Sequence, residues 1–376
     1  MNDVMGVIFA SDNENKLNEL TIHRTTASLP FCGRYRLIDF ALSNFVNAGI
    51  TQIGIVTRSN YSSLMDHIRM GRDWDLNRKN GGLSVFPPFV LNSSREMYKG
   101  KIEAIYSIQG FIRRSQESYV LLSNSNIAMN IDYDEVFKAH AESGADVTML
   151  VHRAKTTTSR RLVVEEDAGE VKDLYFSQTP SSEEKTLGLN VYLIKKDLLL
   201  SLVEHEYARG HVDFEKDILM KQLGALKINA FMVKRHAAIV DDVRTYYNES
   251  MEALDPQVRE DLFYGDSVIY TKVKDSVPTI YKENAAVKNS LIADGCEIDG
   301  LVENSILFRG VKVARGAEVR NSIVMEDGRI MENASVCYAI TDKNVTISSG
   351  RTISGYESYP VVIVKDKTAS LKRRLI

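Results

Sequence analysis

Apolar and polar positions divide the chain into two parts with different periodicity. In the first part, two segments with apolar residues at helical spacing, residues 39–50 and 132–144, each end near a glycine and predict helices. Four apolar runs predict buried strands, at residues 4–10, 51–57, 118–130 and 145–154. This alternation is typical of an α/β domain with a mostly parallel sheet, helices on both faces and ligands bound beyond the carboxyl ends of the strands.

From about residue 277 the helical period disappears and aliphatic residues recur six positions apart. The repeated positions are Ile292 and Ile298, Val313 and Val319, Val324, Ile330 and Val336, and Ile347 and Ile353. A triplet of Asn-Ser-Leu or Asn-Ser-Ile also begins at Asn289, Asn304 and Asn321. This hexapeptide period predicts a parallel β-helix, because an antiparallel β-domain would show a period of two.

Composition narrows the class of protein without pointing to a chemistry. The chain has 376 residues, of which 26% are charged, and a net charge of −3, so we expect two domains and no nucleic-acid partner. Cys32, Cys296 and Cys337 are scattered without metal-ligand spacing, which predicts reduced thiols. The first apolar run is too short to span a membrane and has no basic segment before it. We therefore expect a soluble, cytoplasmic protein without membrane contact.

The first predicted strand runs into a polar loop within GVIFASDNENKLNELT, residues 6–21, where many α/β enzymes hold a phosphate. Such loops usually contain glycines, because only glycine lets backbone N–H groups close around an anion. This loop has none, and it carries Asp12 and Glu14, whose charges would repel a triphosphate. The loop alone leaves open whether a phosphate binds here.

A longer stretch, ASLPFCGRYRLIDFALSNFVNAGITQIGIVT at residues 27–57, resembles the signature of the ADP-glucose pyrophosphorylases, or glucose-1-phosphate adenylyltransferases. YKGKIEAIY, DFEKDIL and IVDDVRTYYNESMEAL resemble further motifs of that family in the same order. The resemblance implies a Rossmann-like nucleotidyltransferase domain at residues 1–250, a helical linker at 251–278, and a left-handed parallel β-helix of hexapeptide repeats at 279–376.

The chain departs from the family's pattern at the nucleotide. Ser11, Asp12 and Glu14 stand at the three glycines of the family's nucleotide loop. Lys16 stands at the arginine that contacts the leaving pyrophosphate, and a lysine lacks the bidentate fork of arginine. The family's GTAD turn becomes GKIE at residues 100–103. Nucleotide binding is therefore expected to be impaired.

The magnesium and sugar-phosphate positions depart as well. In the family two aspartates hold Mg²⁺; Ser125 stands at the first, and the second matches Asp242. One carboxylate is a poor magnesium site, so we expect no metal and interpret Asp242 as a helix N-cap. Gln178 and Thr179 replace the glutamate and the sugar-phosphate lysine of FxEKP, and Asn190 replaces a glycine.

Basic residues survive in a segment whose counterpart in the family helps to bind phosphorylated sugar activators at the junction of the two domains. They are His23, Arg24, Arg34 and Arg36. They are candidates to bind an anionic effector such as a sugar bisphosphate or inorganic phosphate. For Arg36 we favour a structural pairing with Asp39 or a neighbouring carboxylate, and for Arg24 and Arg34 both interpretations stay open.

Loss of site residues on a retained scaffold predicts a non-catalytic or weakly catalytic regulatory subunit, of the D type in this family. Such a pseudoenzyme would join the catalytic glucose-1-phosphate adenylyltransferase subunit in an allosteric hetero-tetramer and modulate ADP-glucose synthesis for glycogen biosynthesis. We expect no tightly bound cofactor, with Mg²⁺ only in the catalytic partner. The alternative is an active sugar-1-phosphate nucleotidyltransferase with an altered site. A hexapeptide acyltransferase is more distant, because all seven histidines precede the β-helix.

Overall fold

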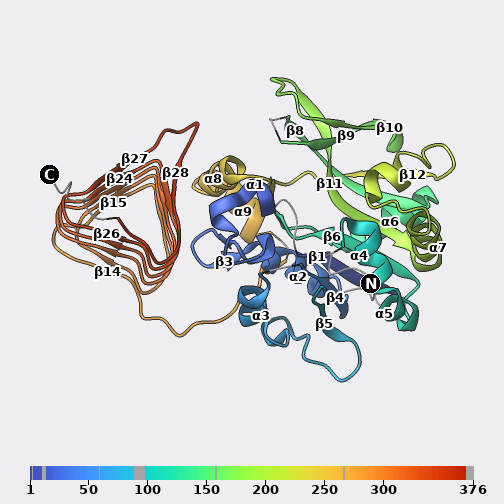
Figure 1. Cartoon of the computed structure of the whole chain (residues 1–376), viewed down its shortest axis with the longest axis horizontal. Coiled ribbons are helices and arrows are strands. Elements are labelled where there is room, and N and C mark those ends of the chain that lie inside the picture. The colour runs from blue at the N-terminus through green and yellow to red at the C-terminus, as the bar shows by residue number, and fades with distance from the viewer. Residues whose placement is uncertain are drawn as a thin grey trace.

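The computed structural model describes residues 1, 3–10, 14–58, 60–88, 98–156, 159–265 and 267–369. Figure 1 shows an α/β domain beside a triangular stack of short strands that reaches the C-terminus. The predicted fold class, an α/β domain followed by a β-helix, is confirmed. Within the described part of the chain, the helices are too short or too polar to cross a lipid bilayer.

A nine-stranded sheet forms the centre of the α/β domain. Its strands, in spatial order, are β5 (Gly82–Phe86), β4 (Gln52–Val56), β1 (Val4–Phe9), β6 (Tyr119–Asn124), β11 (Glu184–Lys195), β8 (Val147–Lys155), β12 (Ile228–Met232), β10 (Glu170–Ser177) and β9 (Arg161–Asp167). The pairings from β5 to β6, and that of β12 with β8, are parallel, as predicted. The other pairings are antiparallel, so the sheet is mixed. One reason is the tight turn at Ala168 and Gly169, which joins β9 to β10 as a hairpin.

Two small sheets complete the domain. They pair β2 (Pro30–Phe31) with β3 (Tyr35–Arg36), and β7 (Ile127–Met129) with β13 (Ala237–Ile239). The strand predicted at residues 118–130 is thus two strands, β6 and β7, in different sheets. The chain leaves the large sheet at Ser125 and Asn126, where β6 ends.

Helices cover both faces of the large sheet, as predicted. The helices of the described residues are α1 (Glu14–Leu17), α2 (Leu37–Asn47), α3 (Ser62–Ile68), α4 (Lys101–Ser107), α5 (Gln109–Arg114), α6 (Tyr133–Ser143), α7 (Lys196–Tyr207), α8 (Val243–Glu252) and α9 (Pro256–Phe263), with a π-helical turn at Glu215–Leu219; of these, α2 to α7 pack on the sheet. Val4 and Ile8 of β1 pack with α2, α3 and α6, whereas Met5 packs with α4, α5 and α7. A Cβ atom at Gly6 would lie 2.4 Å from the Phe45 ring, so this glycine lets α2 approach the sheet.

The C-terminal part winds around three parallel sheets, because every third strand joins the same sheet. The first holds β14 (Ile280–Tyr281), β17 (Glu297–Ile298), β20 (Lys312–Val313), β23 (Arg329–Ile330), β26 (Thr346–Ile347) and β29 (Thr368–Ala369). The second holds β15 (Ala286–Lys288), β18 (Leu301–Glu303), β21 (Glu318–Arg320), β24 (Ser335–Cys337) and β27 (Thr352–Ser354). The third holds β16 (Leu291–Ile292), β19 (Ile306–Leu307), β22 (Ile323–Val324), β25 (Ala339–Thr341) and β28 (Val361–Ile363). These are the three sheets of the predicted left-handed β-helix.

The repeated triplets explain one corner of this β-helix. Asn289, Asn304 and Asn321 have φ values of 43°, 46° and 45°, a left-handed conformation that asparagine tolerates better than most residues. The serine hydroxyls that follow form a ladder between coils. Ser305 Oγ accepts a hydrogen bond from the backbone N–H of Ser322 at 3.2 Å, and its own proton goes to a carbonyl in its coil. The triplet thus supplies a turn and satisfies buried backbone groups.

The two parts share a hydrophobic core that includes residues of α2, α8, α9, β19 and β22. Tyr246 of α8 donates a hydrogen bond to the Pro30 carbonyl, and the neighbouring Tyr247 donates one to the Asn321 carbonyl of the β-helix, both at 2.7 Å. Within the predicted helical linker, residues 251–278, α8 ends at Glu252 and α9 follows, and the described residues between α9 and β14 form no helix or strand. The domain boundaries themselves stay predictions.

Candidate functional site

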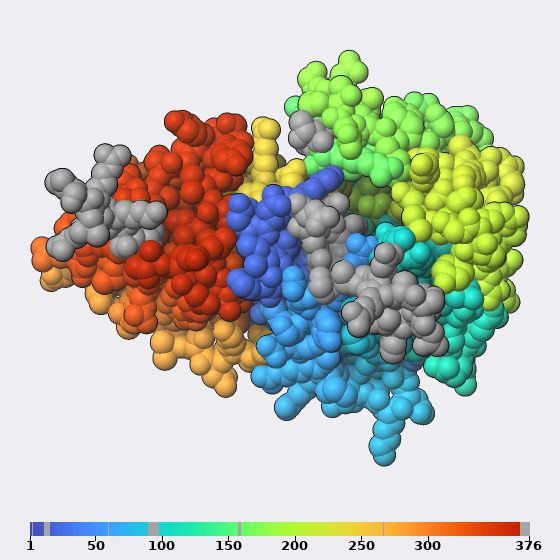
Figure 2. Space-filling model, viewed as in Figure 1, coloured from blue at the N-terminus to red at the C-terminus, as the bar shows by residue number. Residues whose placement is uncertain are grey.

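A cleft of about 490 Å³ opens beyond the carboxyl ends of β1 and β4, where the strand pattern predicts a ligand site. Figure 2 shows this face of the α/β domain, with a recess between the blue N-terminal residues, the green β8–β10 region and the yellow-green residues near 212. Six cationic and three acidic side chains line the cleft, which leaves a surplus of three positive charges. They are Lys16, Arg58, Lys99, Lys101, Arg160 and Arg161, and Asp213, Glu215 and Asp241.

The structure describes only part of the predicted nucleotide loop. Ser11 and Asp12 lie outside the described residues, as does the side chain of Glu14. Lys16, in α1, is exposed and lines the cleft. The predicted arginine-to-lysine exchange therefore places a cation, without the guanidinium fork, at the edge of the cleft.

A largely buried ion pair lies in the lining of the cleft. Lys101 begins α4 and its ammonium group bonds the carboxylate of Glu215, in the π-helical turn; their side chains are 17% and 10% exposed. The Tyr192 hydroxyl donates a second hydrogen bond to Glu215, at 3.1 Å. Burial alone would raise the pKa of Glu215, but the nearby Lys101 holds it below the ordinary 4.5. Both charged residues stand where the family's motifs, GTAD and DFGKD, have a small residue.

Backbone geometry explains why one glycine of the family's motifs, Gly100, is retained in this region and why another can be replaced by Asn190. A Cβ atom at Gly100 would lie 2.1 Å from the Val212 carbonyl oxygen, so this glycine is required for the contact. Asn190 has φ 53° and lines the cleft at a position where the family has glycine. Asparagine tolerates this left-handed conformation, so the strand keeps its path while a side chain enters the cleft.

A second ion pair lies at the wall of the cleft. Arg161 Nε and Asp241 Oδ2 are 2.8 Å apart, and their side chains are about 90% buried. Asp241 also accepts a hydrogen bond from the Asn126 amide at 3.0 Å. Nearby, the Arg160 guanidinium stacks 3.6 Å from the centroid of the Phe176 ring. Asp241, one of the three acidic groups that line the cleft, is therefore already neutralised by an arginine.

The residues do not fit the magnesium ion that the family resemblance implies. Ser125 is fully buried, and its hydroxyl has no hydrogen-bond partner among the described residues. Asp242 caps α8: one carboxylate oxygen accepts from the Thr245 backbone N–H at 2.7 Å, and the other accepts from the Ser159 hydroxyl. A neutral hydroxyl and a carboxylate with both oxygens in use cannot supply the two anionic ligands that Mg²⁺ prefers.

Replacing Asp242 with alanine should lower the free energy of unfolding by about 1 kcal/mol at pH 7, because α8 loses its N-cap. Burial raises the pKa of Asp242, but hydrogen bonds from Ser159 and Thr245 outweigh burial and hold it below the ordinary 3.8. The capping stability is therefore complete above pH 4 and is lost as the pH falls through the lowered pKa. Urea unfolding at pH 7 and at pH 3 checks this; an equal deficit at both values would contradict a role for the ionised carboxylate.

The two residues at the family's sugar-phosphate positions have different surroundings in the structure. Gln178, just beyond β10, lines the cleft. Thr179 is exposed, and its carbonyl oxygen accepts a hydrogen bond from the Thr156 hydroxyl at 2.7 Å. Neither side chain carries the positive charge that a sugar phosphate requires from the family's lysine.

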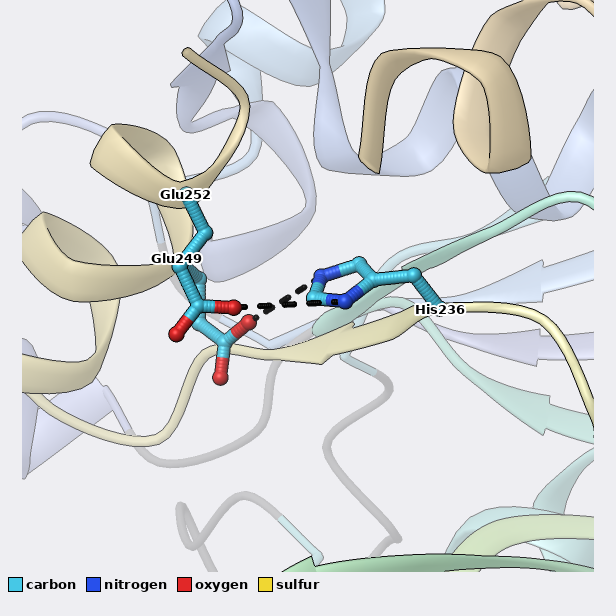
Figure 3. A group of neighbouring side chains, drawn as sticks. All are labelled: His236, Glu249 and Glu252. Atoms are coloured by element: carbon cyan, nitrogen blue, oxygen red, sulfur yellow. Dashed lines mark ion pairs between the residues drawn. The ribbon is translucent and has the colours of Figure 1, made fainter. Parts of the chain in front are cut away.

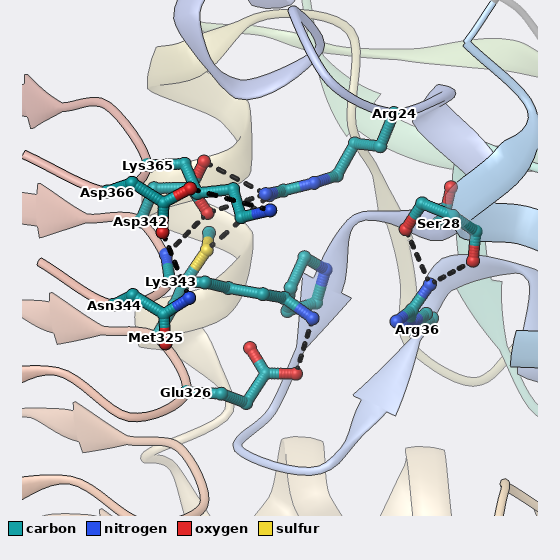
Figure 4. Close-up of polar contacts among 12 residues, drawn as sticks. Arg24, Ser28, Arg36, Met325, Glu326, Asp342, Lys343, Asn344, Lys365 and Asp366 are labelled. Atoms are coloured by element: carbon teal, nitrogen blue, oxygen red, sulfur yellow. Dashed lines mark hydrogen bonds and ion pairs between the residues drawn. The ribbon is translucent and has the colours of Figure 1, made fainter. Parts of the chain in front are cut away.

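The predicted effector residues lie near the junction of the α/β domain and the β-helix (Figure 4). Arg24 is buried and forms an ion pair with Asp342 of the β-helix, in which Arg24 Nη2 donates to both carboxylate oxygens, at 2.7 and 2.9 Å. Its charge thus joins the two parts of the chain, a partner that the sequence did not reveal. The exposed His23 lines a surface pocket together with Lys365 and Asp366.

A second ion pair at this junction joins Lys343 to Glu326, at 2.8 Å. Burial, together with the nearby charges of Arg36 and Arg24, lowers the pKa of Lys343 to about 8. The carboxylate of Glu326 opposes this shift. The Arg36 guanidinium donates hydrogen bonds to Ser63, while its backbone N–H donates to the Asp39 carboxylate. The pairing of Arg36 with Asp39 that the sequence suggests is therefore made by the Arg36 backbone N–H and not by its guanidinium group.

The remaining effector candidate, Arg34, is exposed, with its guanidinium 5.6 Å from the centroid of the Tyr35 ring. Sequence reasoning missed Arg58, Arg160, Arg161, Glu215 and Asp241 as cleft residues. One signal was present, because Lys101 and Glu215 introduce opposite charges into two motifs that otherwise carry small residues.

Comparison with known proteins gives two family models. A nucleotidyl transferase model matches residues 5–248, and a model of the GlmU-like C-terminal hexapeptide region matches residues 276–358. The first covers more than half of the chain.

Similar proteins extend the match over nearly the whole chain. The "Glycogen biosynthesis protein GlgD" of Bacillus subtilis is 34% identical over 364 residues, which is 97% of this chain and 96% of that protein. The protein of the same name in Geobacillus stearothermophilus is 36% identical over 318 residues, 85% and 83% of the two chains. A "Glucose-1-phosphate adenylyltransferase" of Clostridium perfringens is 29% identical over 371 residues, 96% of each chain.

Proposed function

Because the chain belongs to the nucleotidyl transferase family and, within it, to the D-type ADP-glucose pyrophosphorylases, we propose that it is a regulatory subunit with little or no catalytic activity of its own. It joins a catalytic glucose-1-phosphate adenylyltransferase subunit and modulates ADP-glucose synthesis from ATP and glucose 1-phosphate for glycogen biosynthesis. The names of its relatives support glycogen biosynthesis as the setting.

One observation carries the non-catalytic part of this proposal: an ion pair of the chain's own side chains lines the cleft. Lys101 and Glu215 satisfy each other's charge at positions where the family's motifs have small residues. A substrate phosphate would have to separate this pair or bind beside it. Because Ser125 and Asp242 also offer no magnesium site, charge developing on a phosphate would lack its usual stabilisation.

Co-assembly is supported by apolar surface on the β-helix. Tyr356 and Tyr359, in the loop between β27 and β28, are each 76% exposed. Ile280 and Tyr281 of the first coil are each more than half exposed as well. Where such exposed apolar side chains adjoin one another, they mark surfaces that other protein chains cover. The proposed partner is the catalytic subunit, in a mixed tetramer.

We place the effector site at the junction of the two parts. Anionic ligands such as a sugar bisphosphate or inorganic phosphate would meet Arg36 and Lys343 there, while His23 lines a surface pocket with Lys365. Because Arg24 is paired with Asp342, it forms part of the wall of the proposed effector site. An anion bound here contacts both the α/β domain and the β-helix, so it can favour one relative arrangement over another.

The proposal is tested by co-purifying the chain with a catalytic subunit that retains the glycine-rich loop. Tagged and untagged chains are expressed together, and the molar mass of the complex is measured. A mixed tetramer whose activator response differs from that of the catalytic subunit alone is the expected result. Failure of the two chains to co-purify would contradict co-assembly.

A further inference from the structure

Three side chains gather away from the cleft, between α8 and the segment that leads into β13 (Figure 3). His236 immediately precedes β13, and its backbone N–H donates a hydrogen bond to Asp261 at 3.0 Å. Glu249 and Glu252 lie three residues apart on α8 and therefore share one face of the helix. An imidazole nitrogen and one oxygen from each carboxylate all lie within 4.8 Å of one another.

The contacts inside this cluster leave polar atoms unsatisfied. His236 Nε2 and Glu249 Oε2 are 3.5 Å apart, but both atoms are completely buried and neither has a hydrogen-bond partner among the described residues. The other ring nitrogen, Nδ1, lies 3.9 Å from Glu252 Oε2, which is longer than a hydrogen bond. Buried polar atoms that face one another without bonding require an explanation such as a bound ion or water.

The local charge favours a cation. Glu249 Oε2 and Glu252 Oε2 lie 3.5 and 3.9 Å from the two ring nitrogens of His236, and Asp261 accepts a hydrogen bond from the His236 backbone N–H. A divalent cation would neutralise these carboxylates directly.

We propose that His236, Glu249 and Glu252 form a site for a divalent transition-metal ion such as Zn²⁺. One imidazole nitrogen with two carboxylates suits zinc and its neighbours better than Mg²⁺, which prefers oxygen ligands. Around Zn²⁺, tetrahedral ligand atoms lie about 3.4 Å apart. Here one nitrogen and one oxygen from each carboxylate lie within 4.8 Å of one another, and His236 Nε2 is 3.5 Å from Glu249 Oε2. Three protein ligands leave a position for water, and Glu252, whose side chain is 56% exposed, opens the site to solvent.

The site would tie α8 to the strand that precedes it. This helix begins at Asp242, beside the cleft, and its Tyr247 bonds the Asn321 carbonyl of the β-helix. A metal ion bound here therefore holds in place the element that links the cleft to the β-helix. Its role is structural, because the three ligands lie outside the cleft lining.

The test uses the full chain, stripped of metal with EDTA. Zn²⁺ binding is measured by isothermal titration calorimetry, and Co²⁺ is added as a probe whose visible absorption reports the ligand geometry. We expect one Zn²⁺ per chain and a higher melting temperature with the ion. His236→Asn and Glu252→Gln should each lower the affinity at least about tenfold, the smallest loss usual even for residues that only support a ligand. Glu252→Gln changes an exposed side chain, so it keeps the fold intact.

A second histidine and glutamate cluster supplies the matched control. Glu206 accepts hydrogen bonds from His205 and His211, so both carboxylate oxygens already have partners. His211→Asn should leave Zn²⁺ affinity unchanged. The proposal is overturned if the stripped chain binds no Zn²⁺, or if Zn²⁺ binds equally well to His236→Asn and Glu252→Gln. In that case His236 is an imidazolium paired with two carboxylates.

Discussion

Replacing Asp342 with alanine should lower the free energy of unfolding by about 3–5 kcal/mol, because the Arg24 guanidinium then stays buried without a counter-charge. The two side chains are 3% and 1% exposed, and they join the α/β domain to the β-helix. Water cannot replace the missing carboxylate at this depth without opening the junction. Urea unfolding followed by circular dichroism measures the loss.

Two further variants separate charge from packing at this position. Glu297 pairs with Lys312 on the exposed surface of the β-helix, so Glu297→Ala should cost no more than about 1 kcal/mol. The double variant Arg24→Leu with Asp342→Leu should regain most of the stability, because apolar side chains of similar size replace both charges. If Asp342→Ala cost as little as Glu297→Ala, the junction would not depend on this ion pair.

Replacing Glu215 with leucine should lower the free energy of unfolding by a similar amount, about 3–5 kcal/mol. The Lys101 ammonium group, which is 17% exposed, would lose its carboxylate, and the Tyr192 hydroxyl would keep only the Asn190 amide oxygen, at 3.2 Å, as its acceptor. The loss is measured by urea unfolding at neutral pH, where Glu215 is ionised because Lys101 outweighs the effect of burial and lowers its pKa.

The matched variant is Lys101→Met with Glu215→Leu, which removes both charges and keeps the volume of the side chains. Its stability should return close to that of the native chain. Turnover should stay absent, because Ser125 and Asp242 still provide no magnesium site. A double variant as unstable as the single one would show that packing, and not the buried charge, explains the effect of Glu215.

Local patterns predicted much of the fold. The alternation of apolar strands and amphipathic segments predicted β1, β4, α2 and α6, whose terminal glycines, Gly49 and Gly144, have positive φ. The six-residue spacing predicted the three sheets of the β-helix, because each repeat buries its own aliphatic residue against the next coil. The antiparallel half of the large sheet was not predicted. The strand order in that half depends on which distant strands pair with β11. The apolar pattern of a strand does not specify which strands lie beside it.

The site was predicted less completely, because its contacts join residues far apart in the chain. Lys101 and Glu215 are 114 residues apart, and Arg24 and Asp342 are 318 residues apart. A single sequence shows that a charged residue replaces a small residue in a motif, but it does not show which residue of opposite charge pairs with it. Asp242 was interpreted correctly as an N-cap, since that signal lies within a few residues of the start of α8. The gathering of His236 with the two glutamates of α8 was missed for the same reason as the ion pairs.

The most direct test is pyrophosphate release from ATP and glucose 1-phosphate in the presence of Mg²⁺. It is measured with the purified chain alone, with a catalytic subunit alone, and with the two together. We predict little or no release from the chain alone, and in the mixture a rate or an activator response that differs from that of the catalytic subunit. Turnover by the chain alone at a rate close to that of the catalytic subunit would contradict the account, because the cleft lined by the Lys101–Glu215 ion pair would then be an active site.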